Sequence, residues 1–184
     1  IDMRLIMREN FDAIRAQGFV PIAERLGHTF RLDLLALDLA LKALAANPLR
    51  TIAINVSAAT VTDRRAIAEF ARALGVRPEL GARLIVEITE TAAITDLSGS
   101  LSFAAALREL GCRIALDDFG AGHTSFRNLR ALRPTTIKID QSFAQDLQAN
   151  PDNALFVSTL ARLAAGLGAT TVAEGVESMD DADA

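Results

Sequence analysis

Five short apolar segments rich in Ile, Val, Leu and Thr recur along the chain, and longer amphipathic stretches separate them. Because these segments are nearly continuous in apolar residues, they are typical of strands buried on both faces of a sheet. The repeated strand–helix order predicts βα units and a parallel sheet. The predicted strands are Thr51 to Val56, Arg83 to Ile88, Arg113 to Leu116, Thr136 to Ile139 and Thr170 to Ala173. The predicted helices are Phe30 to Ala46, Asp63 to Leu74, Leu97 to Leu110, Ser125 to Leu132 and Asn153 to Leu167.

Composition narrows the class of protein further. The 184 residues are 51% hydrophobic and carry a net charge of -4, which argues against binding duplex nucleic acid. A single cysteine excludes zinc ribbons and zinc fingers. We find neither an apolar run of ~20 residues for a membrane span nor a signal peptide. We therefore expect one cytoplasmic α/β domain over residues 1–184, within a longer protein.

Each predicted strand ends in a polar or charged side chain. These side chains are Asn55, Glu87, the pair Asp117 and Asp118, Lys138, and Glu174. The C-terminal ends of parallel strands lie on one face, where α/β barrels and open α/β sheets carry their sites. Any one of these residues could simply cap a helix, but the pattern holds at all five strands. The sequence therefore predicts a functional site at this face.

The residue types at this face indicate hard metal ions. Four carboxylates placed together repel one another unless protons or metal ions neutralise them. Carboxylate and amide oxygens, with no Cys or His among them, suit Mg²⁺ or Mn²⁺. Adjacent Asp117 and Asp118 can serve two ions about 4 Å apart, as in phosphodiester hydrolysis, and Lys138 can orient the attacking water. A barrel enzyme that uses Mg²⁺ for an enolate-type reaction would collect similar groups.

Six motifs follow one another along the chain: Phe19-Val20-Pro21-Ile22-Ala23-Glu24, Asn55-Val56-Ser57, Glu87-Ile88-Thr89-Glu90, Asp117-Asp118-Phe119-Gly120-Ala121-Gly122, Lys138-Ile139-Asp140 and Ala173-Glu174-Gly175-Val176-Glu177. In order and approximate spacing they resemble the signatures of the EAL domain family. The resemblance implies a modified TIM-type (β/α)8 barrel, incomplete at both ends here, that hydrolyses cyclic di-GMP to linear pGpG with two Mg²⁺ or Mn²⁺ ions. It implies metal ligation by the residues Asn55, Glu87, Asp117 and Asp118, with Glu174 helping to hold metal or water and Lys138 beside the nucleophilic water.

Glu90 stands outside the strand, three residues after Glu87. The resemblance implies that it holds the loop from Phe119 to Ser125. This loop contains Gly120 and Gly122, so it is flexible and exposes backbone N–H groups that a carboxylate could accept. The alternative is a solvated glutamate beside a loop.

The Glu-Ala-Leu signature of the family's first strand is missing. The matching segment is about Met3 to Met7, with Met3 at the position of the metal-binding glutamate. A thioether does not bind a hard cation. Three explanations remain open: a degenerate domain that binds cyclic di-GMP as a receptor, a glutamate in residues outside this sequence, or replacement by Asp2 or Glu9.

The sequence is also short for a closed barrel, which needs roughly 250 residues. Either residues beyond Ala184 complete the barrel or it stays open, and we favour the first explanation or a partner that covers the gap. The family resemblance further implies a homodimer formed through the loop and helix after Asp118. Sensory or GGDEF-type domains are expected elsewhere in the full-length protein.

Overall fold

The structure of the chain is a computed structural model that describes residues 6–9, 12–120, 126–145, 147 and 150–176, with side chains from residue 18 onward. Its strands are β1 (Ile6–Glu9), β2 (Asp12–Arg15), β3 (Ile52–Val56), β4 (Leu84–Thr89), β5 (Arg113–Phe119), β6 (Thr136–Ile139) and β7 (Thr170–Ala173). Its helices are α1 (Ala16–Arg25), α2 (Thr29–Ala46), α3 (Ala58–Thr62), α4 (Arg64–Gly75), the 3-10 helix η1 (Pro78–Arg83), α5 (Glu90–Thr95), α6 (Leu97–Glu109), α7 (Phe126–Leu132), α8 (Gln141–Ala144) and α9 (Pro151–Gly166).

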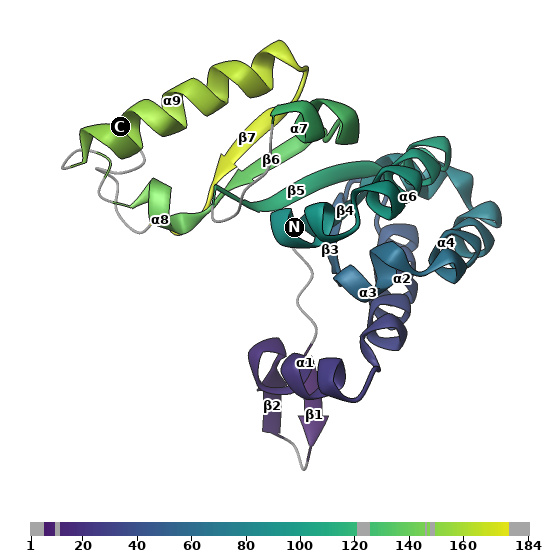
Figure 1. Cartoon of the computed structure of the whole chain (residues 1–184). Coiled ribbons are helices and arrows are strands. Elements are labelled where there is room, and N and C mark those ends of the chain that lie inside the picture. Colours follow the sequence, from purple (N-terminus) through teal and green to yellow (C-terminus); the bar gives the residue numbers. More distant parts are fainter. Residues whose placement is uncertain (1–5, 10–11, 121–125, 146, 148–149, 177–184) are drawn as a thin grey trace.

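The five predicted strands form one parallel sheet in chain order, β3-β4-β5-β6-β7. Each strand is joined to the next by a helical connection, as the alternating pattern predicts (Figure 1). β5 runs three residues further than expected and ends at Phe119, because it continues through an irregular stretch between Leu116 and Phe119. Among the described residues, β3 and β7 are the two edges of the sheet.

Among the described residues, the N-terminal segment forms a sheet of its own, although Met3 to Met7 match the family's first strand. β1 and β2 pair with each other in an antiparallel hairpin that forms a separate two-stranded sheet. The hairpin lies beside α1 at the purple end of the chain in Figure 1. Met3 itself lies outside the described residues. A hairpin satisfies its backbone groups locally, whereas joining a parallel sheet requires a longer crossover.

Local capping explains where several helices begin. The side chain of Ser57 accepts a hydrogen bond from the N–H of Thr60 at the start of α3. α9 begins at Pro151, two residues before the predicted start, because Asn150 caps it and proline is preset for the first helical position. At the C-terminal end of α2, Arg83 donates from Nη1 to the backbone carbonyls of Leu44, Asn47 and Arg50 and so stabilises the end of the helix.

The hydrophobic core lies between the helices and the parallel sheet. Phe70 on α4 and Phe103 on α6 are almost fully buried and meet edge to face, with ring centroids 5.5 Å apart. The α2 side chains Leu37 and Leu44 are buried in the same core. Burial of this apolar surface holds β3, β4 and β5 in place and so fixes the positions of their C-terminal ends. None of the described helices is both long and apolar enough to cross a lipid bilayer.

Candidate metal centre

Strand register brings the predicted site residues to one edge of the sheet, called here the rim. Asn55 on β3 pairs with Glu87 on β4, so their side chains share a face of the sheet. Thr89 pairs with Asp117 on β5, which places Asp117 further along the same edge. Glu174 follows β7 directly, and its backbone N–H donates to the carbonyl of Ile139 on β6 at 3.1 Å.

Lys138 lies at the centre of the rim and forms three ion pairs. Its Nζ is 2.7 Å from Oε1 of Glu174, 2.9 Å from Oδ1 of Asp117 and 3.2 Å from Oε2 of Glu87. The Lys138 side chain is only 10% exposed, and those of Glu87 and Asp117 are equally well buried. Side chains from four strand segments, β4, β5, β6 and the end of β7, therefore converge on one point.

The ammonium group of Lys138 is strongly held in its charged form. Burial acts to lower the pKa of Lys138, but hydrogen bonds to Glu174 and Asp117 and the charges of Asp117 and Glu87 outweigh burial. The pKa of Lys138 therefore lies well above its usual value. At neutral pH this side chain can supply positive charge and hydrogen bonds, but it cannot accept a proton as a general base.

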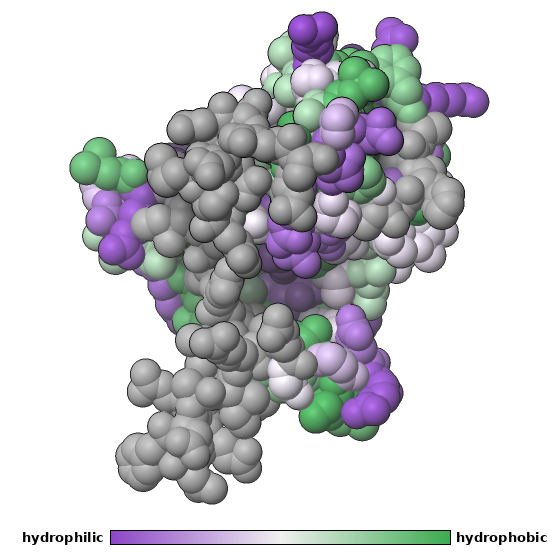
Figure 2. All heavy atoms as spheres, turned by 90° about the vertical axis from the view of Figure 1, so that its left-hand side faces the viewer, coloured by the Kyte–Doolittle hydropathy of each residue, from purple (hydrophilic) through white to green (hydrophobic). Residues whose placement is uncertain are grey.

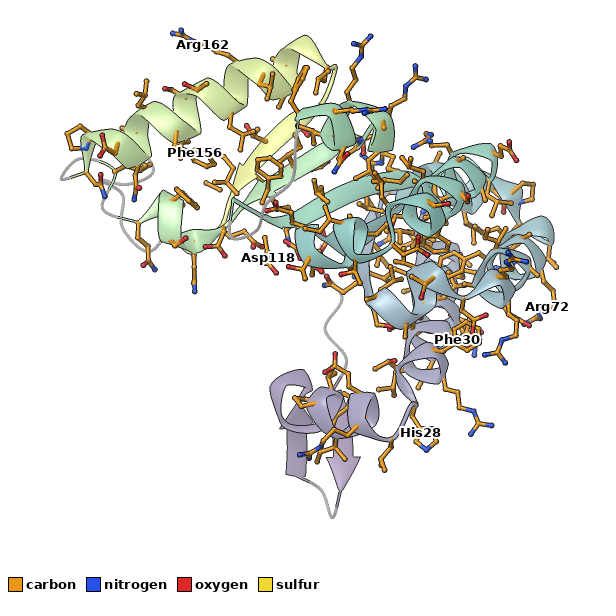
Figure 3. The ribbon with its side chains drawn as sticks, in the orientation of Figure 1. His28, Phe30, Arg72, Asp118, Phe156 and Arg162 are labelled. Carbon is orange, nitrogen blue, oxygen red and sulfur yellow. The ribbon has the colours of Figure 1, made fainter. Side chains whose placement is uncertain are left out.

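An irregularity in β5 lets two consecutive aspartates face the same site. Successive side chains of a regular strand point to opposite faces, so Asp117 and Asp118 would ordinarily be separated. The pairing of β5 with β6 shifts between Leu116 and Phe119, and Asp118 has a φ of 54°. Carboxylate oxygens of Asp117, Asp118 and Glu174 consequently lie within 4.8 Å of one another. We call these three residues the acidic cluster; Figure 3 shows Asp118 at the end of β5.

Burial and the neighbouring acids raise the proton affinity of Asp118. Burial is the largest cause of the raised pKa of Asp118, and the negative charges of Asp117, Glu174 and Asp140 add to it. The charge of Lys138 acts in the opposite direction without cancelling these effects. A bound divalent cation would relieve this repulsion, so the cluster has the electrostatic character of a cation site.

The two remaining predicted ligands, Glu87 and Asn55, are not members of the acidic cluster. Glu87 reaches it through the shared contact with Lys138. Asn55 is solvent-exposed and is placed by its register beside Glu87. All these donors are oxygen atoms, so the residues fit Mg²⁺ or Mn²⁺ and are a poor match for softer metals.

Glu90 is buried at the first position of α5, and only 2% of it is exposed. Its Oε2 accepts a hydrogen bond from the backbone N–H of Gly120 at 2.8 Å. This contact ties the end of β5 to the start of α5. We expect Glu90 to hold the Gly-rich loop, but residues 121–125 of that loop lie outside the described residues.

Asp33 is a polar residue near the rim that belongs to none of the six motifs. Its carboxylate, on the buried face of α2, accepts hydrogen bonds from Ser57, two residues after Asn55, and from Thr60. The sequence held one signal that could have identified it: Asp33 falls in the apolar stripe of α2, at helical spacing from Ala36, Leu37 and Ala40.

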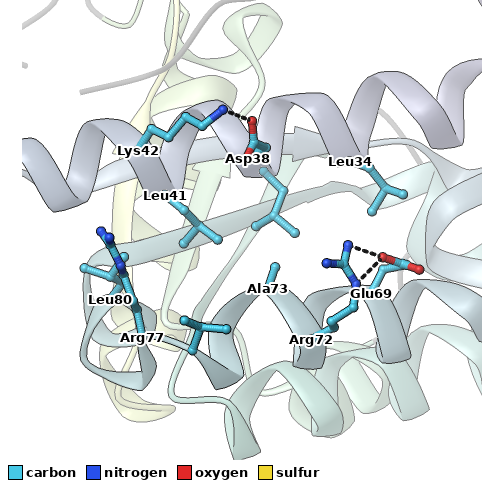
Figure 4. Close-up of a pocket in the computed structure, with 11 residues that line it drawn as sticks. Leu34, Asp38, Leu41, Lys42, Glu69, Arg72, Ala73, Arg77 and Leu80 are labelled. Carbon is cyan, nitrogen blue, oxygen red and sulfur yellow. Dashed lines mark hydrogen bonds and ion pairs between the residues drawn. The ribbon is translucent and has the colours of Figure 1, made fainter.

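The described part of the structure also contains two cavities lined by other residues. One, of about 330 Å³, separates α2 from α4 and is bordered by the ion pairs Lys42–Asp38 and Arg72–Glu69 (Figure 4). The other, of about 540 Å³, lies between α7 and α9 and includes Phe126 and Phe156 in its lining. Neither cavity is lined by a predicted site residue. In space-filling view, hydrophilic and hydrophobic side chains are interspersed over one face of the molecule (Figure 2).

Comparison with known proteins identifies the family to which the chain belongs. Residues 4–184 match the family model described as "EAL domain". The chain is 32% identical over 173 residues to the cyclic di-GMP phosphodiesterase PdeF of Escherichia coli, covering 92% of this chain and 23% of PdeF. It is 38% identical over 166 residues to a cyclic di-GMP phosphodiesterase of Pseudomonas aeruginosa, covering 88% of this chain and 28% of that protein. The chain thus spans about a quarter of the length of these relatives.

Solved structures confirm the expected fold class, a TIM-type arrangement of parallel strands and helices. The PaMucR phosphodiesterase in complex with cyclic di-GMP is 31% identical, with a TM-score of 0.87 over 93% of this chain and 76% of that one. The FimX EAL domain of Xanthomonas citri is 22% identical, with a TM-score of 0.91 over 99% of this chain and 74% of that one, and shows the likeness of fold. The chain belongs to the EAL domain family.

Proposed function

We propose that this chain hydrolyses cyclic di-GMP to linear pGpG in the cytoplasm, with Mg²⁺ or Mn²⁺ as cofactor. The observation that carries the proposal is the convergence of the acidic cluster and Glu87 around Lys138 at the rim. Two relatives above 30% identity are named cyclic di-GMP phosphodiesterases, and the solved PaMucR structure contains that nucleotide. A manganese and cyclic di-GMP complex of Klebsiella pneumoniae BlrP1 has a similar fold, with 29% identity and a TM-score of 0.74.

In this proposal the oxygen donors of the rim hold two metal ions. The ligands are Asn55, Glu87, Asp117, Asp118 and Glu174, with Glu174 also holding water. Bound divalent ions supply Lewis acidity toward the phosphodiester and lower the pKa of a coordinated water. Neutral rim residues could not balance two such charges, whereas the acidic cluster carries negative charges already held close together.

Lys138 acts through its charge in the proposed reaction. Because its raised pKa keeps the ammonium protonated, it can orient a water molecule by donating to it. The same charge stabilises the negative charge that develops on the phosphoryl oxygens. Its three carboxylate partners hold Nζ in place before substrate arrives, so little reorganisation is needed.

The second candidate function is a receptor that binds cyclic di-GMP without cutting it. The sequence observation that favours it is Met3, which matches the position of the family's first-strand glutamate. Without that ligand, one metal ion would have an incomplete set of donors. In this case the charge of Lys138 would neutralise part of the rim, and nucleotide affinity would not require turnover.

The experiment that separates these functions follows the nucleotide itself. Protein incubated with cyclic di-GMP and Mn²⁺ is analysed by chromatography, and pGpG is the expected product. Asp117→Asn should abolish the product, while Asp38→Asn, an exposed aspartate on α2, should not change it. Intact cyclic di-GMP together with calorimetric binding would establish the receptor. Failure to bind the dinucleotide would overturn both and leave the enolate-type reaction.

The proposal treats residues 1–184 as a single domain of a longer signalling protein. Its partners are cyclic di-GMP, a second copy of the chain in a homodimer, and sensory or GGDEF-type domains elsewhere in that protein. Sedimentation of the purified chain at several concentrations tests the homodimer directly.

A further inference from the structure

Asp33 lies where an apolar residue would be expected. It belongs to the buried stripe of α2, formed with Thr29, Ala36, Leu37 and other residues at helical spacing, and is only 9% exposed. An ionised carboxylate is costly to bury unless hydrogen bonds compensate it. Burial is the main cause of the raised pKa of Asp33, and its hydrogen bonds act in the opposite direction. Asp33 therefore persists in the core through its specific contacts.

Those contacts all reach one short segment after β3. Oδ2 of Asp33 accepts hydrogen bonds from the backbone N–H of Ser57 at 2.9 Å and from its Oγ at 2.7 Å. The same oxygen accepts a third hydrogen bond from Oγ1 of Thr60, which is fully buried. Ser57 is also the N-cap of α3. One carboxylate oxygen thus fixes the turn that joins β3 to α3.

This turn directly follows a proposed metal ligand. Asn55 is the penultimate residue of β3, and Ser57 is the first residue after the strand. Asn55 lies at the rim in register with Glu87, which contacts Lys138. β3 is an edge strand among the described residues, so only β4 restrains it from within the sheet. Contacts from α2 and α3 must supply the remaining restraint on its end.

We propose that Asp33 is a positioning residue that fixes the end of β3 so that the Asn55 amide can serve the metal centre. This inference rests on the proposed metal-dependent function. Asp33 itself does not touch the rim groups; it acts through Ser57 and Thr60. Outer contacts of this kind typically change metal affinity because they orient a ligand that they do not replace.

The test measures Mn²⁺ binding by titration calorimetry, in the absence of nucleotide, alongside thermal unfolding. Asp33→Asn keeps the side-chain volume but removes the negative charge of the carboxylate whose Oδ2 accepts three hydrogen bonds. We expect it to lower Mn²⁺ affinity by about 10- to 100-fold. The matched control is Leu44→Val, on the same helix but at its other end, which destabilises the core without contacting the β3 turn. It should lower the melting temperature and leave Mn²⁺ affinity unchanged.

A double-mutant cycle with Asn55→Ala identifies the route of the effect. If Asp33 acts through Asn55, Asp33→Asn should change Mn²⁺ affinity by about twofold or less when Asn55 is already alanine. An equal loss in both backgrounds would overturn the proposal, because Asp33 would then act on the whole fold. If Asp33→Asn does not fold, or the Asn55→Ala protein binds too weakly to titrate, Thr60→Val replaces Asp33→Asn as the test variant. Thr60→Val should then lower Mn²⁺ affinity, whereas Leu44→Val should not, and an equal Mn²⁺ affinity in the two variants would overturn the proposal.

The outcomes separate this inference from the proposed function. Wild-type protein that binds no Mn²⁺ contradicts the metal centre and the inference together. Wild-type binding that Asp33→Asn leaves unchanged contradicts only the role of Asp33. The role of Asp33 is also contradicted if Leu44→Val and Asp33→Asn lower the melting temperature equally and both lower Mn²⁺ affinity by the same factor.

Discussion

Oε2 of Glu90 accepts a hydrogen bond from the backbone N–H of Gly120 at 2.8 Å, although thirty residues separate them. Glu90 begins α5, while Gly120 follows the irregular end of β5 that carries Asp117 and Asp118. The contact therefore links the helix after one rim strand to the aspartates of the next. Because Glu90 is 2% exposed, its charge depends on such donors.

Removing the Glu90 carboxylate should weaken both the fold and the metal centre. Glu90→Ala leaves the N–H of Gly120 without this acceptor, and a hydrogen bond to a charged group contributes about 1.5–3 kcal/mol. Glu90→Gln keeps an acceptor oxygen, so its free energy of unfolding should lie between those of wild type and Glu90→Ala. The measurement is urea unfolding, together with the Mn²⁺ concentration needed for half-maximal turnover. Unchanged metal dependence in Glu90→Ala would contradict the assigned role.

Gly120 should tolerate a side chain less well than another glycine with positive φ. Its φ is 107°, and an added Cβ would lie 2.8 Å from Cε2 of Phe143. Gly168 has a φ of 76° with open space around it, so Gly168→Ala measures backbone strain alone, about 1–2 kcal/mol. Gly120→Ala should lower the free energy of unfolding by about 1–3 kcal/mol more than Gly168→Ala does, because the added methyl group overpacks the site. Equal losses of unfolding free energy in the two variants would disprove the steric contribution.

Lys138 should be essential to the stability of the metal-free rim. Lys138→Met keeps most of the side-chain volume but leaves Glu87 and Asp117 buried without this cation, and breaking such a pair costs about 3–5 kcal/mol. The exposed pair Lys42–Asp38 supplies the control, since Lys42→Met should cost about 1 kcal/mol or less. Thermal unfolding with and without Mn²⁺ checks both.

A bound cation should compensate partly for the missing ammonium group. We therefore expect Mn²⁺ to raise the melting temperature of Lys138→Met more than that of wild type. A smaller Mn²⁺ effect in the variant would show that Lys138 supports the metal ligands rather than competing with the metal for them.

Asp118 should make the metal-free protein less stable as the pH rises. Burial and neighbouring acids raise the pKa of Asp118 above its ordinary value of 3.8, so the folded state binds its proton more tightly than the unfolded state does. Its contribution to stability is present below pH 3.8 and is lost as the pH rises through the folded-state pKa. Asp118→Asn should therefore become more stable than wild type towards pH 7, in urea unfolding with chelator present.

Asp63 provides a control of opposite sign. Hydrogen bonds from Arg65 lower the pKa of this partly exposed helix cap, so its contribution is present above pH 3.8 and is lost as the pH falls. Asp63→Asn keeps the cap, but it should be less stable than wild type at pH 7, and this difference should shrink towards pH 3.

The Asp118→Asn substitution has a second effect, which is independent of pH: asparagine also tolerates the φ of 54° at position 118. A stability difference for Asp118→Asn that is flat with pH would refute the electrostatic explanation.

Much of the parallel sheet was predictable because its signals are local. The strand Thr136–Ile139 and the strand Thr170–Ala173 have the predicted bounds, and the other three differ by one to three residues at an end. Continuous apolar runs between amphipathic stretches allow few other arrangements. The helix predicted from Phe30 to Ala46 begins one residue earlier, at Thr29, and ends as expected before Pro48.

Other features depend on contacts between distant segments. The segment Met3 to Met7 matches the family's first strand, and its described residues Ile6 and Met7 belong to a separate hairpin. Periodicity reports that a segment is extended but not which strand it pairs with. The role of Asp33 was equally hidden, because its partners Ser57 and Thr60 lie 24 and 27 residues away.

The sequence by itself determined which side chains stand at the ends of the strands, since alternation and apolar runs set the secondary structure and a parallel sheet collects those ends on one edge. Only the tertiary structure decided how they meet. The irregular backbone of β5 turns Asp118 toward Asp117, and the packing of β4, β5, β6 and β7 places Glu87, Asp117 and Glu174 around Lys138. These charges attract or repel over a few ångströms, so their chemistry depends on distances that strand register and core packing set together.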